Sequence, residues 1–550
     1  MKYSPEKTLA ALCLASSAKY KDSPAFVMLS EGKISRRVTY AQMGSRARQI
    51  GRLLNTLGIE KGDRVLILSE NCPEWPLAYF GIAFAGAVSV PLLTGFSSEQ
   101  IRHIASCAGI SAVCLSRAMA EKIEITKTDS LFSQIPFIYI DSITDGQCGE
   151  EISVAINGNG DSTEKRMSLR VTEESAALPQ SKADDLAAII YTSGTSGNSK
   201  GVMLSGANII SCAISSLSFV KLYPRDRLLS VLPLAHSYEC SLGLIAPIIS
   251  GSSVTYLDKP PSPSVLLPAV RLLRPTVMVT VPLLIEKIYK NAIVPKLRTS
   301  RLYKFPLTRG IAVKFAGRKL VSALGGRIRF FGIGGAPLSP EVENFLYRAR
   351  FPYSIGYGLT EAAPLVAGNA PLHFKINSGI SAANGVTFRI AGISAGEGEI
   401  QVRGPNVMMG YYNDKEKTAE AFTSDGWLHT GDFGSLDKKG RLHIRGRLKA
   451  LLLGPSGENI YPEEIEGLLS SSRLVEDALV YTGEKGELVA MVSLSEAAKA
   501  AAGAIENALE ELRSWVNKKL AVFSRLSRIE IRHEPFEKTP TMKIKRYLYD

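Results

Sequence analysis

The chain lacks the cysteine pattern of a secreted or zinc-binding protein. Its 550 residues contain seven cysteines, an odd number, and no CxxC pair. Scattered cysteines of this kind are typical of proteins kept in a reducing compartment, so we expect a cytoplasmic location. No apolar run reaches the ~18 residues that a bilayer-spanning helix requires. The short apolar run 9–15, which follows Lys2 and Lys7, is interpreted as the start of an amphipathic helix, with a cleaved signal peptide as the alternative.

Acidic residues are missing from one long segment. Residues 287–329 contain twelve Lys or Arg and no Asp or Glu, which accounts for nearly all of the net charge of +13. One interpretation is an ordinary solvated helix face. The other is a peripheral contact with the anionic inner face of a membrane, with an acyl-carrier protein, or with polyanions such as ATP and CoA. Neither an aromatic stacking platform nor a nucleic-acid-binding motif accompanies these cations, so no nucleic-acid partner is expected.

The order of sequence patterns predicts an α/β fold with more than one unit. A helical pattern over 40–57 is followed by the apolar strand 64–68, and this alternation continues, which favours parallel sheets covered on both faces by helices. The polar stretch 148–182 is interpreted as a surface connection. After residue 385, short strands closed by glycines predict a small β-barrel. We therefore expect a large N-terminal domain over 1–446 and a small, mobile α+β domain over 447–550.

A loop rich in glycine and hydroxyl groups follows the predicted strand 187–191. Glycines let a backbone approach phosphate closely, and successive N–H groups can form an anion-binding nest. Hydroxyl groups and one lysine add donors suited to a triphosphate: Thr192, Ser193, Thr195, Ser196, Ser199 and Lys200, around Gly194 and Gly197. The order of residues differs from GxxxxGK[ST], which excludes a P-loop NTPase.

Five further segments, together with this loop, resemble the adenylate-forming superfamily of acyl-CoA synthetases, peptide-synthetase adenylation domains and luciferase. They occur in the family's order: 334–338 (GGAPL), 356–361 (GYGLTE), 427–432 (WLHTGD), 446–449 (GRLK) and 538–544 (KTPTMKI). The resemblance extends from about residue 35 to the C-terminus and is nearest to bacterial long-chain fatty acyl-CoA synthetases. It implies an enzyme that joins a carboxylic acid to AMP, with release of pyrophosphate, and then transfers the acyl group to coenzyme A.

The resemblance also implies roles for individual residues. Lys543 is the expected catalytic cation, Glu361 binds Mg²⁺ with Thr192, and His236 forms a wall of the acyl site. Lys449 is the hinge, and Gly457, Glu458 and Asn459 border the CoA channel. The expected ATP-binding residues are Thr192, Ser193, Gly194, Thr195, Ser196, Gly197, Lys200, Gly335, Ala336, Pro337, Gly356, Tyr357, Gly358, Thr360, Asp432 and Arg447.

The residue types suit the chemistry that the resemblance implies. Attack of a carboxylate on the α-phosphorus of ATP brings two anions together, so positioning and charge neutralisation dominate the catalysis. Lys543 would supply a flexible point cation, and Glu361 a hard oxygen ligand for Mg²⁺.

The sequence favours a fatty acid as substrate. Ser237 stands where the amino-acid-activating branch carries an Asp that holds the substrate's amino group, which disfavours an α-amino acid. The apolar runs 242–249 and 277–284 could line an acyl tunnel or belong to ordinary core. Three alternatives remain: an acyl-carrier protein as acceptor, another acid such as an aromatic or medium-chain one, and a catalytically silent lipid- or nucleotide-binding relative.

Overall fold

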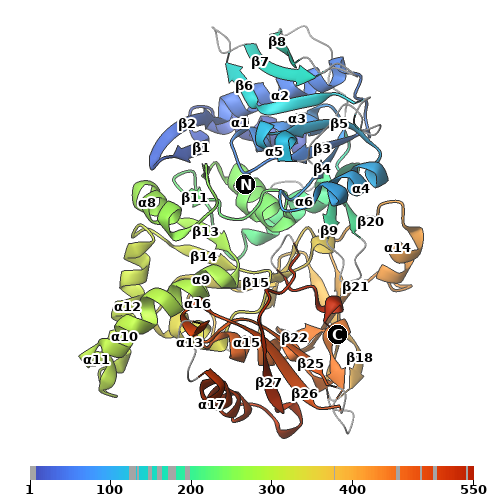
Figure 1. The fold of residues 1–550 in the computed structure, drawn as a ribbon. Helices are drawn as coiled ribbons and strands as arrows, with labels where there is room; N and C mark the ends of the chain where they lie inside the picture. The colour runs from blue at the N-terminus through green and yellow to red at the C-terminus, as the bar shows by residue number, and fades with distance from the viewer. Residues whose placement is uncertain are drawn as a thin grey trace.

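The computed structural model describes residues 8–122, 132, 135–145, 151–157, 164–170, 181–192, 199–376, 378–394, 396–453, 459–483, 486–499, 505–539 and 543–549. Two large sheets form the upper and left parts of the molecule, and the C-terminal part lies below them (Figure 1). The predicted α/β class with parallel sheets is confirmed.

The first nine-stranded sheet has the order β17-β16-β15-β14-β13-β11-β12-β1-β2, and its five central pairings are parallel. Its strands are β1 (Pro24–Ser30), β2 (Lys33–Thr39), β11 (Arg227–Leu229), β12 (Ser253–Leu257), β13 (Val277–Thr280), β14 (Phe330–Ile333), β15 (Tyr353–Gly358), β16 (Leu365–Gly368) and β17 (Ser381–Ala382). Helices that belong to this half are α8 (Pro263–Leu273), α9 (Pro282–Ile288), α10 (Val294–Thr299), α11 (Arg301–Lys304), α12 (Arg309–Ala323) and α13 (Pro340–Arg348), with the π-helix η2 (Tyr289–Ile293) after α9.

The second nine-stranded sheet has the order β20-β10-β9-β4-β3-β5-β6-β7-β8. Its strands are β3 (Arg64–Leu68), β4 (Val88–Pro91), β5 (Ile110–Leu115), β6 (Phe137–Asp145), β7 (Glu151–Asn157), β8 (Glu164–Arg170), β9 (Leu186–Thr192), β10 (Lys200–Ser205) and β20 (Gly410–Tyr411). The helices that follow its strands are α3 (Glu74–Phe84), α4 (Ser98–Ala108), α5 (Arg117–Lys122), α6 (Gly206–Ser216) and α14 (Lys415–Ala421).

The prediction of a mere connection over 148–182 was wrong in part. Strands β7 and β8 pair as an antiparallel hairpin and extend the second sheet at one edge. The sequence of β7 places Ile152, Val154 and Ile156 at every second position, which is the strand period. The polar residues 158–163, which follow this strand in the sequence, made the short alternation difficult to recognise.

Helices between the two sheets form the largest hydrophobic core. Buried side chains of α1 (Leu9–Tyr20), α2 (Tyr40–Thr56), α3 and α6 pack there with the π-helix η1 (Glu239–Ile245) and α7 (Ala246–Ser250). The N-terminal apolar run is thus part of a buried helix. Both candidate tunnel runs also supply core residues, because η1 and α7 lie in this core and β13 is buried at all four positions.

The rest of the chain forms smaller units. A four-stranded antiparallel sheet, order β18-β19-β21-β22, stands at the position of the expected barrel: β18 (Thr387–Ser394), β19 (Glu397–Arg403), β21 (Leu428–Leu436) and β22 (Leu442–Arg447). The C-terminal part has its own core between α15 (Pro462–Ser470), α17 (Ile505–Asn517) and the sheet of β25 (Val475–Thr482), β26 (Leu488–Leu494) and β27 (Arg528–Arg532). The short strands β23 (Leu452–Leu453) and β24 (Asn459–Ile460) and the short helix α16 (Glu496–Lys499) complete it. Within the described ranges, no helix is both long and apolar enough to cross a bilayer.

Candidate active site

A buried carboxylate lies where two sheets of the large part meet. Strands β21 and β22 pair so that Asp432 stands opposite Arg447, and Arg447 Nε lies 3.0 Å from Asp432 Oδ1. The hydroxyl of Tyr357, on β15, donates to Oδ2 of the same carboxylate at 2.6 Å. Asp432 is only 5% exposed. Three residues predicted from separate motifs therefore meet at one point.

The pKa values of this group show how strongly it is held. Burial raises the pKa of Asp432, while the Arg447 cation and the Tyr357 hydrogen bond oppose that rise. The pKa of Tyr357 is raised well above its usual value by burial and by the charge of Asp432. Tyr357 is therefore held as a protonated donor at physiological pH, which keeps the carboxylate oriented.

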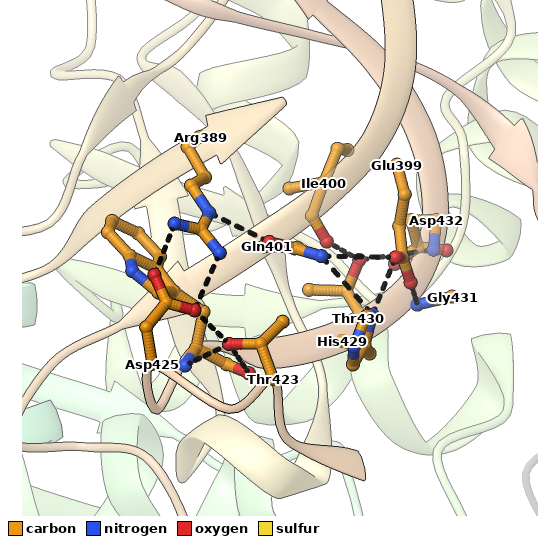
Figure 2. Close-up of polar contacts among 11 residues, drawn as sticks. Arg389, Glu399, Ile400, Gln401, Thr423, Asp425, His429, Thr430, Gly431 and Asp432 are labelled. Carbon is orange, nitrogen blue, oxygen red and sulfur yellow. Dashed lines mark hydrogen bonds and ion pairs between the residues drawn. The ribbon is translucent and has the colours of Figure 1, made fainter. Parts of the chain in front are cut away.

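A polar network behind Asp432 fixes the strand that carries it (Figure 2). The side chain of Glu399 on β19 makes two contacts. Its Oε2 lies 2.6 Å from His429 Nδ1, and its Oε1 accepts a hydrogen bond from the backbone N–H of Gly431 at 3.3 Å. Thr430 Oγ1 donates to the carbonyl of Ile400 at 2.6 Å and accepts from the N–H of Asp432 at 3.1 Å. Thr430 and Gly431, the two residues before Asp432, are thus both hydrogen-bonded to residues of the neighbouring strand β19.

The same network continues away from the site. Arg389 Nε donates to Gln401 Oε1 at 2.8 Å, and its two terminal nitrogens reach the carboxylate of Asp425 at 2.7 and 3.0 Å. The guanidinium also lies over the ring of Trp427. Sequence analysis missed these supporting residues, because an Arg or Gln on an alternating strand gives no local signal of what it contacts.

The predicted catalytic lysine lies in the same electrostatic field. The Lys543 backbone N–H donates to Thr539 Oγ1 at 3.2 Å and its carbonyl accepts from Thr539 N–H at 2.7 Å, so the C-terminal turn is closed on itself. Burial and the Arg447 cation lower the pKa of Lys543, and the carboxylates of Glu463 and Asp432 oppose this shift. Part of the side chain is accessible to solvent, as a group that must meet a substrate requires. Residues 540–542 lie outside the described ranges.

The C-terminal part is docked where it can present this lysine. Lys290 Nζ donates to the carbonyls of Ser470 and Ser472 at the end of α15, and Arg473 donates to the carbonyl of Lys290 at 3.2 Å. Two further contacts join the parts: Lys287 with Glu476 at 3.3 Å, and the Tyr461 hydroxyl with Glu397 at 2.9 Å. Lys287 and Lys290, the first two cations of the basic segment, therefore form contacts within the protein.

A second acidic group lies close to Tyr411 and Lys200, at the start of β10. Glu361, in the 3-10 helix η3 (Thr360–Ala362), accepts a hydrogen bond from the Tyr411 hydroxyl at 3.0 Å. Lys200 Nζ lies 4.8 Å from the centre of the Tyr411 ring, and Lys200 pairs with Thr192 across β9 and β10. Tyr411 thus contacts both Glu361 and Lys200, and Lys200 pairs with Thr192 on the neighbouring strand. The predicted loop residues Ser193, Gly194, Thr195, Ser196 and Gly197 lie outside the described residues.

Oxygen ligands at this place suit Mg²⁺. Within the ranges given above, no group of three His, Cys, Asp or Glu side chains converges as a metal site. Mg²⁺ often takes only one or two protein ligands beside substrate phosphates and water. Tyr411 occupies Oε1 of Glu361; this carboxylate, with the Thr192 hydroxyl, fits such a partial ligand set.

His236 is a neutral imidazole in the segment between β11 and η1. Burial and the nearby Lys543 cation lower its pKa to about 4. Its Nδ1 accepts the backbone N–H of Tyr238 at 3.1 Å, which places the remaining proton on Nε2. The next residue, Ser237, is buried and its Oγ lies 3.5 Å from Thr360 Oγ1, beside Glu361. The expected acyl wall thus adjoins the expected metal ligand.

The remaining predicted residues have varied positions. Gly335, Ala336 and Pro337 form an exposed loop after β14, Gly356 and Gly358 lie on β15, and Lys449 is exposed in the 3-10 helix η4 (Leu448–Ala450). A Cβ at Gly358 would lie 1.9 Å from the carbonyl oxygen of Pro364, so only glycine fits there. Gly457 and Glu458 lie outside the described residues, and of Asn459 only the backbone, in β24, is described.

A buried glutamate behind the acyl wall was missed by sequence analysis. Glu239, the first residue of η1, is fully buried; its Oε1 accepts from Ser230 Oγ at 2.5 Å, and Oε2 has no hydrogen-bond partner among the described residues. Asn71 Nδ2 donates to Ser230 Oγ and to the carbonyl of Leu232, which fixes the segment before His236. Burial raises the pKa of Glu239 to about 8, and Ser230 opposes the rise. A π-helix, which often occurs at functional sites, was the only available signal, and it is not readable from sequence.

Comparisons with known proteins show which family the chain resembles. The sequence profile described as AMP-binding enzyme matches residues 14–412. Peroxisomal long chain acyl-CoA synthetase 7 of Arabidopsis thaliana is 31% identical, over 83% of this chain and 68% of the relative. 4-Coumarate–CoA ligase 3 of Oryza sativa is 27% identical, over 98% of this chain and 91% of the relative. The crystal structure of ATP-bound MatB from Rhodopseudomonas palustris has a TM-score of 0.75 at 23% identity and covers 98% of each chain.

Glu239 should make stability depend on pH. Its ordinary pKa is 4.5 and its pKa in the folded protein is about 8. Between these values the folded protein keeps a proton that the unfolded chain releases, so stability falls as pH rises, and the loss is complete above pH 8. Tyr238, Cys240 and Tyr256 face the carboxyl group and are themselves uncharged in this range.

The Glu239→Gln variant removes this titration. We expect the thermal midpoint of the variant to rise relative to the wild type between about pH 5 and about pH 8.5, at roughly 1 °C per kcal/mol for a chain of 550 residues. Glu534→Gln, whose side chain is 85% exposed, serves as the matched control. Parallel pH curves for wild type and Glu239→Gln would contradict the assignment of a buried neutral carboxyl.

Proposed function

The chain belongs to the AMP-binding enzyme family, as an AMP-forming acid–thiol ligase of the acyl-CoA ligase type, and from this premise we propose an ATP-dependent long-chain fatty acid–CoA ligase. The first step forms acyl-AMP and pyrophosphate, and the second forms acyl-CoA and AMP. The observation that carries the proposal is the convergence of Tyr357, Asp432, Arg447 and Lys543 on one site.

In the proposed first step, Asp432 binds the ribose of ATP. Its two oxygens are oriented by Tyr357 and Arg447 and still have lone pairs that accept from hydroxyl groups. The ring of Tyr357 then lies against the adenine, beside the exposed loop 335–337. Lys200 and the loop after Thr192 face the β- and γ-phosphates, and a Mg²⁺ ion held by Glu361 and Thr192 would neutralise phosphate charge.

Lys543 acts at the bond that forms. One carboxylate oxygen of the acid attacks the α-phosphorus, and the bond to the β-phosphate oxygen breaks with its electron pair leaving on pyrophosphate. The lysine cation bridges the attacking carboxylate and the α-phosphate and so offsets the repulsion between two anions. Its lowered pKa reflects burial beside Arg447, a cost that an incoming anion relieves.

In the proposed second step, the thiolate of CoA attacks the acyl carbonyl carbon and AMP leaves with the electron pair of the acyl–oxygen bond. We propose that the small domain, 447–550, rotates about Lys449 between the two steps, with the segment of Gly457, Glu458 and Asn459 beside the CoA channel. The exposed position of Lys449 at the end of β22 suits a hinge.

The class of acid rests on the acyl wall and on the relatives. Ser237 bonds towards Thr360 and provides no charge for an amino group. His236 is neutral. The long-chain synthetase from Arabidopsis thaliana supports a fatty acid, whereas the rice 4-coumarate ligase keeps an aromatic acid as the alternative. The acceptor proposed is CoA, with an acyl-carrier protein as the alternative; for either anionic partner the basic segment 287–329 offers complementary charge.

Replacing Lys543 with Ala tests the first step. We expect acyl-AMP formation, measured in a single turnover, to fall by about 10²–10³ because a donor to the transition state is lost, while ATP affinity measured by calorimetry changes little. Lys545→Ala is the matched control, since that side chain pairs with Glu537 on the same C-terminal turn. Near-normal adenylation by Lys543→Ala would contradict the role given to this residue.

Pyrophosphate release with a panel of acids tests the substrate and the acceptor. The panel contains fatty acids from short to long chain and 4-coumarate, each with ATP and Mg²⁺, with and without CoA. We expect CoA-dependent turnover that is highest with a long-chain acid and yields AMP and acyl-CoA. Turnover that requires an acyl-carrier protein, or that prefers 4-coumarate, would replace the proposal with that alternative, and no release with any acid would support a silent relative.

A further inference from the structure

Three consecutive helices, α10, α11 and α12, project from one side of the molecule (Figure 1). Five large apolar side chains on α11, on α12 and on the turn between them are at least half exposed. We call them the apolar tip: Leu302, Phe305, Leu307, Ile311 and Phe315. Leu307 is 98% exposed and Phe305 is 67% exposed. Contiguous exposed apolar side chains of this size mark an interaction surface more often than chance exposure does.

Hydrogen bonds hold the apolar tip in one shape. Thr308 Oγ1 donates to the carbonyl of Leu302 at 2.7 Å, and the N–H of Arg309 donates to the carbonyl of Phe305 at 3.0 Å. Arg309 Nε also donates to the carbonyl of Tyr303 at 3.2 Å. The turn between α11 and α12 is thus closed, and its apolar side chains point outward because the backbone is fixed.

The helix that follows has two different faces. Ala312, Val313 and Leu320 are buried against the protein, whereas Ile311 and Phe315 lie one turn apart on the outer face. Lys319, another turn along, lies with Nζ 4.7 Å from the centre of the Phe315 ring. The outer face of α12 is therefore apolar towards the tip and basic beyond it.

Cations surround the apolar tip, and no acidic residue interrupts them. Eight exposed cations lie on α10, α11 and α12: Lys296, Arg298, Arg301, Lys304, Arg309, Lys314, Arg318 and Lys319. None of the eight forms an ion pair with a described residue. The basic segment's ion pairs lie at its two ends instead, as Lys287 with Glu476 and Arg329 with Asp226. The cations left for an external partner are those around the tip.

We propose that the apolar tip inserts into the head-group region of an anionic membrane while the eight cations face lipid phosphates. Apolar side chains combined with a basic surround are what an interfacial membrane contact needs, since neither signal alone gives stable binding. An acidic carrier protein would satisfy the cations but leave Phe305 and Leu307 in water. A second copy of the chain would bring two sets of eight like charges together. Anionic lipid is therefore the proposed partner of this surface, and membrane binding does not depend on the acyl-CoA ligase activity.

Vesicle flotation of the full-length protein tests the proposal without any substrate. We expect binding to vesicles of phosphatidylcholine with one-third phosphatidylglycerol, weak binding to pure phosphatidylcholine, and loss of binding at high salt. The Phe305→Ser/Leu307→Ser variant should bind at least about tenfold more weakly. Val522→Ser, which removes an apolar side chain that is 75% exposed on the C-terminal part, should bind like the wild type.

The charges are tested separately. Lys314→Gln/Arg318→Gln/Lys319→Gln should bind anionic vesicles about a hundredfold more weakly, since each cation near an anionic surface contributes about fivefold. Lys438→Gln/Lys439→Gln, two exposed cations in the turn before β22, is the matched control and should bind like the wild type. Insertion itself is measured with Leu307→Trp, whose fluorescence should be quenched by lipids brominated along the acyl chain.

Four outcomes overturn the proposal. The first three are no binding of the wild type to anionic vesicles, equal binding of the tip variant and the wild type, and a dimer in solution that Leu307→Ser dissociates. The fourth is tighter, salt-sensitive binding to an acyl-carrier protein than to vesicles. Pyrophosphate release in solution should be unchanged in all tip variants, so a failure of the ligase activity and a failure of membrane binding are distinguished.

Discussion

The buried carboxylate of Asp432 is the constraint on which the site depends. A carboxylate that is 5% exposed requires partners in place before it is stable, and it has them in Arg447 at 3.0 Å and Tyr357 at 2.6 Å. These partners come from β22 and β15, so the carboxylate ties the four-stranded sheet to the first nine-stranded sheet. Glu399 then accepts from the backbone N–H of Gly431, and Thr430 Oγ1 accepts from the backbone N–H of Asp432 itself. The cation of Lys543 enters the same field from the C-terminal part.

Sequence alone predicted which segments form the site but not how they meet. The motifs at 356–361, 427–432 and 446–449 were recognised in order, and the structure joins Tyr357, Asp432 and Arg447 directly. The supporting contacts of Glu399 and Arg389 depend on strand register, which local sequence does not encode. Glu239 was passed over because a single Glu next to an apolar run looks like a surface residue. The hairpin of β7 and β8 was missed because polar turn residues outweighed a short period-two pattern.

The basic segment shows why composition predicts charge but not its use. Twelve cations over 287–329 allowed two interpretations, an ordinary solvated helix face and a contact with an anionic partner. Lys287 and Lys290 hold the C-terminal part in the position that presents Lys543, and Arg329 binds the buried Asp226. Position in the fold, rather than sequence neighbourhood, separates these cations from those around the apolar tip. Likewise, the sequence of the apolar runs 242–249 and 277–284 allowed either a tunnel or ordinary core. The structure buries most of both runs in the core but leaves Leu283 43% exposed.

The distribution of charge across the site gives it a polarity that fits the proposed amphiphilic acid. Lys543, Arg447 and Lys200 lie on the side where phosphate and carboxylate meet in the proposed reaction. On the acyl side, the low pKa of His236 leaves it neutral, and the raised pKa of Glu239 leaves that carboxyl protonated at neutral pH. A charge on either residue would be desolvated beside an apolar chain, so both would oppose binding of a fatty acid if they ionised. Burial shifts the two pKa values in opposite directions, so the Glu239 carboxyl stays protonated and the His236 imidazole stays unprotonated. The proposed acyl wall is therefore uncharged although it keeps its polar side chains.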